Sequence, residues 1–66
     1  MDSYGELLKK ARESKNLSYD TIAREISIDK KYLEGLEAED NAAFPGEPYM
    51  IGFLKNYALY LNLDDE

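Results

Sequence analysis

The chain has 66 residues, contains neither cysteine nor histidine, and carries a formal net charge of −6. A chain this short can bury one small core but not a deep substrate pocket beside it. The missing residue types exclude disulfides, thiolate metal sites, histidine as a general base and cysteine as a nucleophile. We therefore expect a single domain over residues 1–66 that is not an enzyme, takes no small-molecule substrate and needs no cofactor or metal.

The charge is distributed unevenly along the chain. Residues 32–66 hold a single base, Lys55, against eight acids, whereas the other seven bases lie in the first 31 residues. Nucleic-acid binding depends on Lys and Arg neutralising phosphates, so the net charge of −6 disfavours DNA as a partner.

Two sequence features concern the membrane. No run of ~18 apolar residues is present, and the first residues lack the basic and apolar regions of a secretory signal.

The chain ends at Asp64-Asp65-Glu66 without an evident end to its architecture. We expect it to be a fragment of a longer protein.

The first predicted helix covers about residues 4–15. Ser3 and Glu6 have the S-x-x-E spacing of a capping box, and Asn16 can adopt the left-handed conformation that ends a helix. We expect one face to be apolar and another to be solvated, formed respectively by Leu7, Leu8 and Ala11, and by Lys9, Lys10, Arg12 and Lys15.

Two further helices follow, over about residues 19–26 and from Asp29 to about residue 38. Ser18 and Asp29 are suitable N-caps. Ser27 lies in the turn between these two helices, at a position where a turn between two packed helices often has glycine, which predicts a wider or slightly strained turn. Gly35 costs the third helix about 1 kcal/mol relative to alanine. Close packing of another segment against this position would be one reason for a glycine there.

The fourth predicted helix begins at Pro48 and runs to about residue 61, and Asn62 is the residue expected to terminate it. Residues 39–47 before it form a predicted loop in which Phe44 is expected to plug the core. The helical period places one set of apolar residues inward and a set of aromatic residues at the edge of that stripe. These sets are Met50, Leu54, Tyr57, Ala58 and Leu61, and Tyr49, Phe53 and Tyr60.

An ordered set of apolar positions spans the second and third helices. Its spacing is typical of a helix-turn-helix, in which a small residue allows the helices to cross closely and larger ones close the corner. The predicted fold is a compact all-α domain of four to five helices, of the lambda-repressor-like or XRE type. An ordinary small helical bundle is the alternative. The set is Ile22, Ala23, Ile26, Ile28, Leu33 and Leu36.

The combination of segments 5–12, 17–18, 31–37 and 44–57 is more specific. The last segment holds Phe-Pro-Gly-Glu-Pro-Tyr followed by Gly-Phe-Leu-x-x-Tyr. This combination resembles the N-terminal cytoplasmic domain of RodZ-like proteins, which are relatives of the XRE-type regulators. The resemblance implies a bacterial cell-shape protein that lies at the inner face of the cell membrane. It also implies binding to the actin-like filament protein MreB, and a downstream membrane-spanning helix.

The same resemblance implies which residues face the partner. Two aromatics one turn apart at the start of the fourth helix match Tyr49 and Phe53, and a basic residue near the start of the third helix matches Lys31. Where the family pattern has a basic residue before Gly52, this chain has Ile51. The full predicted set for partner binding is Tyr49, Phe53, Lys31, Lys30 and Tyr60.

Two alternatives remain open from the residues. A sequence-specific DNA-binding regulator would use Lys30, Lys31 and Arg24, although the third helix also carries acids that would oppose the phosphates. Alternatively, Tyr49 and Phe53 pack on Phe44 and the first helix and serve the fold alone. The pair Glu37 and Asp40 is interpreted as ordinary exposed acids at a helix end.

Overall fold

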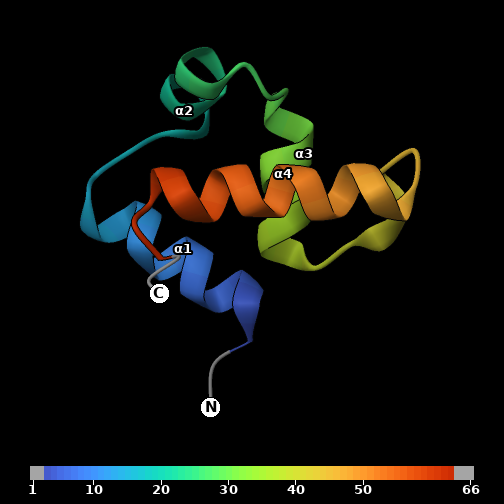
Figure 1. Cartoon of the computed structure of the whole chain (residues 1–66). Coiled ribbons are helices and arrows are strands. Elements are labelled where there is room, and N and C mark those ends of the chain that lie inside the picture. Colours follow the sequence, from blue (N-terminus) through green and yellow to red (C-terminus); the bar gives the residue numbers. More distant parts are fainter. Residues whose placement is uncertain (1–2, 64–66) are drawn as a thin grey trace.

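The computed structural model describes residues 3–63, and within this range every regular element is helical (Figure 1). Helix α4 crosses α3, while α2 and α1 lie on opposite sides of α4 (Figure 1). The elements are α1 (Tyr4–Ser14), α2 (Tyr19–Ile26), α3 (Lys30–Ala38), the 3-10 turn η1 (Asn41–Ala43) and α4 (Glu47–Tyr60). The predicted all-α fold is confirmed, and the predicted loop before the last helix contains η1.

Side-chain caps fix where three of the helices begin. Ser3 Oγ accepts a hydrogen bond from the Glu6 N–H, Ser18 Oγ from the Thr21 N–H, and Asp29 Oδ1 from the Lys31 N–H. Helix α4 begins after Gly46 without a side-chain cap, and Pro48 is its second residue rather than its first. A proline there costs little because the first backbone N–H groups of a helix have no intrahelical acceptor.

The helices end at non-glycine residues in the left-handed conformation. Asn16 and Asn62 have φ of 56° and 62°, as expected from their tolerance of this region. Ser27, with φ of 59°, forms the predicted turn between α2 and α3. Glu39 has φ of 58° and was not predicted to end α3.

The core lies where α1, α2 and α4 meet α3. The helix-turn-helix positions Ile22, Ile28, Leu33 and Leu36 are buried as predicted, whereas Ala23 and Ile26 are half-buried at its edge. Leu7 was expected to face inward, but it is 46% exposed because α1 turns the neighbouring Leu8 toward α3. The buried side chains are Leu8, Ile22, Ile28, Leu33, Leu36, Tyr57 and Leu61.

Close packing explains the glycine in α3. A Cβ atom on Gly35 would lie 3.0 Å from the Cβ of Ala43 and 3.3 Å from Cε1 of Phe44. The segment after α3 therefore folds back tightly onto this helix. Phe44 packs against the edge of the core, half-buried, rather than at its centre.

Candidate protein-binding site

Three aromatic rings in mutual contact join α3, the loop after η1 and α4. The rings of Tyr32 and Phe53 have centroids 4.9 Å apart, and those of Tyr32 and Phe44 are 5.4 Å apart. The ring centroids of Phe44 and Phe53 are 6.1 Å apart. All three side chains are half-buried, so the aromatic cluster (Tyr32, Phe44 and Phe53) is fixed by the core but still reaches solvent.

Tyr49 lies one helical turn before Phe53 and is far more exposed. Its exposed fraction of 59% is the highest among the large apolar side chains of residues 3–63. A hollow of about 330 Å³ lined by Asn41, Gly46, Glu47 and Met50 lies at the same end of α4. The start of α4 therefore offers an uncovered ring with a recess beside it.

A positive charge adjoins the aromatic cluster. The Nζ atom of Lys31 lies 5.2 Å from the centroid of the Tyr32 ring, within the range of a cation–π contact. Three of the predicted partner-binding residues thus belong to one region, since Lys31 contacts Tyr32 and Tyr32 stacks on Phe53, with Tyr49 one turn away.

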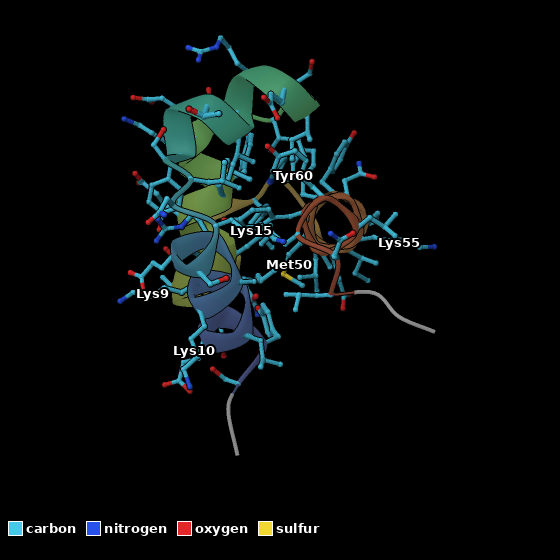
Figure 2. All side chains as sticks on the ribbon, turned by 90° about the vertical axis from the view of Figure 1, so that its left-hand side faces the viewer. Lys9, Lys10, Lys15, Met50, Lys55 and Tyr60 are labelled. Carbon is cyan, nitrogen blue, oxygen red and sulfur yellow. The ribbon has the colours of Figure 1, made fainter. Side chains whose placement is uncertain are left out.

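The other predicted site residues lie outside that region or are paired. The Tyr60 hydroxyl donates a hydrogen bond to Glu25, which raises the pKa of Tyr60 and ties α4 to α2. Figure 2 shows Tyr60 beside α2, while Met50 points toward α1 and Lys55 points away from the body of the domain. Lys30 forms an exposed ion pair with Asp20 at 3.5 Å. Arg24 is an exposed residue of α2.

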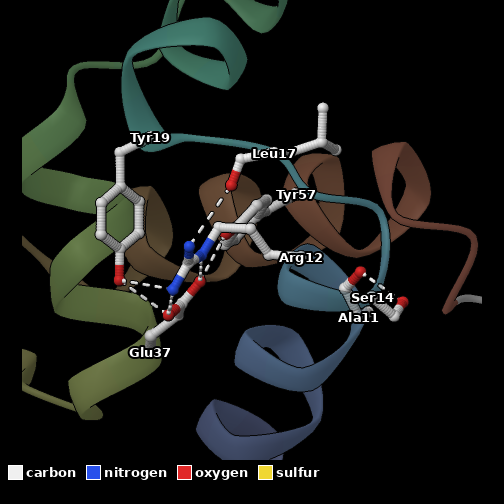
Figure 3. Close-up of polar contacts among 7 residues, drawn as sticks. All are labelled: Ala11, Arg12, Ser14, Leu17, Tyr19, Glu37 and Tyr57. Atoms are coloured by element: carbon white, nitrogen blue, oxygen red, sulfur yellow. Dashed lines mark hydrogen bonds and ion pairs between the residues drawn. The ribbon is translucent and has the colours of Figure 1, made fainter.

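A polar network that the sequence interpretation missed joins all four helices (Figure 3). The carboxylate of Glu37 accepts hydrogen bonds from Arg12 Nε at 2.7 Å, Arg12 Nη2 at 3.0 Å, and the hydroxyls of Tyr19 and Tyr57 at 2.7 and 2.6 Å. The guanidinium also lies over the Tyr19 ring, 4.2 Å from its centroid.

Two expectations from the sequence are therefore wrong. Arg12 does not belong to a solvated face and Glu37 is not an exposed acid, because their side chains are only 13% and 5% exposed. The spacing held a signal for both. Arg12 lies one turn after the buried Leu8, and Glu37 lies one turn after the buried Leu33. A tyrosine placed in a core stripe, such as Tyr57, also needs a partner for its hydroxyl.

The network fixes the charge state of its members. Burial opposes ionisation of Glu37, but hydrogen bonds from Arg12, Tyr57 and Tyr19 outweigh it and lower the pKa of the carboxyl. Burial and the bond to Glu37 raise the pKa of Tyr57 and raise that of Tyr19 to about 12. The hydrogen bond to Glu37 raises the pKa of Arg12. None of these groups gains or loses a proton near neutral pH, which suits a structural role.

Metal ligation receives no support within residues 3–63, where no group of three or more acids is arranged to hold an ion. The acidic run Asp64-Asp65-Glu66 lies outside the described residues.

Comparison with known proteins agrees with this architecture. The chain belongs to the helix-turn-helix domain family, which it matches over residues 7–66. It is 39% identical over 62 residues to the cytoskeleton protein RodZ of Streptococcus pneumoniae (strain ATCC BAA-255 / R6), an alignment that covers 94% of this chain. The chain spans 22% of the length of that relative. No solved structure matches the chain. The resemblance to RodZ-like proteins, inferred from the sequence motifs, is confirmed.

Proposed function

We propose that this domain binds the actin-like filament protein MreB through the surface formed by Tyr49, Phe53 and Lys31. The observation that carries the proposal is the exposed ring of Tyr49 one turn from the aromatic cluster. The similarity to a cytoskeleton protein supports this class of partner. Exposed aromatic side chains next to apolar ones are typical of protein interfaces.

Each residue has a distinct task in this interface. Tyr49 supplies a large apolar ring with a polar tip, which a partner can cover at low conformational cost. Phe53 is held in place by stacking on Tyr32, so its exposed edge is pre-organised and binding orders little. Lys31 sets the orientation by meeting an acidic group on the partner surface.

The test compares MreB binding by matched variants of α4. We expect Tyr49→Ala to weaken binding by about 2 kcal/mol or more, and the Tyr49→Ala, Phe53→Ala double variant to weaken it further. Ile51→Ala is the control, because Ile51 is 53% exposed but lies on the opposite side of α4. Titration calorimetry measures the affinity and circular dichroism checks the fold. An unchanged affinity in a folded double variant would remove the proposal.

Tethering of MreB to the membrane is the second part of the proposal. Within residues 3–63 no helix has the length and hydropathy needed to cross a bilayer. We propose that the domain is the N-terminal part of a longer membrane-anchored protein and lies at the cytoplasmic face of the membrane. Fractionation of the full gene product, with and without detergent, tests this. Recovery in the soluble fraction without detergent would contradict it.

DNA recognition is the second candidate, favoured by the helix-turn-helix itself and by the exposed Lys30, Lys31 and Arg24. Against it stand the exposed Glu34 on α3 and the pairing of Lys30 with Asp20. A salt titration of binding to duplex DNA distinguishes the two. Sequence-dependent binding that persists at physiological salt would favour a regulator.

A further inference from the structure

The side of α4 opposite the proposed MreB surface is also uncovered. Residues 48–63 contain a single charge, Lys55, in a chain that is 33% charged. A groove of about 510 Å³ runs along this side. We call it the outer groove, and it is lined by Ile51, Leu54, Lys55, Ala58 and Leu63.

The outer groove has the spacing of a helix-packing surface. Ile51, Leu54, Lys55 and Ala58 stand at positions i, i+3, i+4 and i+7, the pattern by which one helix packs against another. Half-buried Leu54 and Ala58 form the floor of the groove, while Ile51 at its side is exposed. The small side chain of Ala58 allows the backbone of another helix to approach closely.

Lys55 indicates what kind of helix fits there. It points away from the domain (Figure 2) and forms no ion pair within residues 3–63. A carboxylate on the partner would satisfy this charge inside an otherwise apolar contact.

A second copy of this chain fits poorly. Lys55 lies near the middle of the apolar stripe, so both parallel and antiparallel two-fold pairings of α4 would bring two Lys55 side chains together. Each domain also carries a net charge of −6, which opposes self-association and contact with an anionic lipid surface.

We propose that the outer groove binds an amphipathic helix of another protein, whose apolar stripe carries one acidic residue opposite Lys55. This surface is separate from that of Tyr49, so the inference does not rest on MreB binding. Tyr49 and Ile51 are two residues apart, which at 100° per residue places these two flanks about 160° from each other around α4.

The test is a charge-swap experiment with two helical peptides. Both carry the same leucine stripe with i, i+3, i+4 and i+7 spacing, and they differ in having Glu or Lys at its centre. We expect the wild-type chain to prefer the Glu peptide by about threefold and Lys55→Glu to prefer the Lys peptide by a similar factor, as for a partly exposed ion pair. Ala58→Arg should abolish binding of both peptides, whereas Tyr49→Ala should leave it unchanged.

Amide chemical shifts locate the contact while the affinities are measured. Changes should centre on Ile51, Leu54, Ala58 and Leu63. The proposal is overturned if neither peptide binds, if the preference does not reverse with Lys55→Glu, or if the shifts centre on Tyr49. It is equally overturned if these residues respond to dilution of the free chain, which would indicate self-association, or to vesicles containing phosphatidylglycerol.

Discussion

The backbone carbonyl oxygen of Glu37 lies 2.2 Å from the point where a Cβ atom on Gly5 would be placed. The N–H of Gly5 also donates a hydrogen bond to the side chain of Glu39 at 2.9 Å. Helices α1 and α3 therefore approach each other so closely at this point that only hydrogen fits between them.

Gly5→Ala should destabilise the domain by about 2 kcal/mol, although alanine is the better helix former. The helices must separate because the blocking atom belongs to the backbone. Urea unfolding followed by circular dichroism measures the change. Gly52→Ala is the control, since nothing lies within 4 Å of its Cβ position, and it should stabilise the chain by up to about 1 kcal/mol. Equal effects of the two substitutions would contradict the packing argument.

Tyr57→Phe removes one hydroxyl from the Glu37 network and leaves the ring in the core. We expect a loss of about 2 kcal/mol in the free energy of unfolding, because the bond goes to a charged and largely buried acceptor. Tyr49→Phe should change stability little, since Tyr49 is well exposed. Chemical denaturation measures the free energy of unfolding of both variants. An equal loss of stability in both would contradict the role given to the Glu37 network.

Acid should weaken the fold through Glu37. Its pKa is lowered in the folded state, so its contribution is complete above the ordinary value of 4.5 and is lost as the pH falls through the folded pKa. Glu39, whose pKa is also lowered by its hydrogen bonds from Ser3 and Gly5, acts in the same direction. Stability should therefore fall below about pH 4.5.

Glu37→Gln should reduce this acid dependence and destabilise the chain by about 3 kcal/mol near neutral pH, because it leaves Arg12 largely buried without its counter-charge. Thermal unfolding between pH 3 and pH 7 measures both effects. Glu34→Gln, on the exposed side of α3, is the control and should keep the wild-type pH profile. A wild-type profile in Glu37→Gln would show that other acids dominate.

Ser27→Gly should stabilise the domain, by roughly 0.5–1 kcal/mol. Ser27 has φ of 59°, a conformation that disfavours a side chain with a Cβ atom, and glycine removes that cost. Ser14→Gly is the comparison, because Ser14 lies within α1 and should lose helix propensity. Melting temperatures that move in the same direction for both variants would argue against strain at this turn.

Local signals made much of this fold predictable. The caps Ser3, Ser18 and Asp29 and the left-handed Asn16 act within one turn, so the sequence alone shows them. The errors came from long-range geometry. Periodicity could not decide that Leu8, rather than Leu7, turns toward α3, and it gave no reason to bring Arg12 to Glu37, 25 residues away.

The candidate site was predictable in part for the same reason. The helical period placed Tyr49 and Phe53 on one edge of α4. The stacking of Phe53 on Tyr32 and its tilted contact with Phe44 depend on how α4 crosses α3, which a single sequence does not specify. The bond that ties Tyr60 to Glu25 spans 35 residues and was equally hidden.

The Glu37 carboxylate, held by residues from α1, α2 and α4, has a consequence for how the domain opens. Detaching any one of these helices would strip a donor from a charge that water scarcely reaches. Opening of a single helix therefore costs more than the loss of its own apolar packing, which favours cooperative opening even in a chain of 66 residues. In hydrogen exchange, the most protected amides of all four helices should then have the same opening free energy, rather than a different one for each helix.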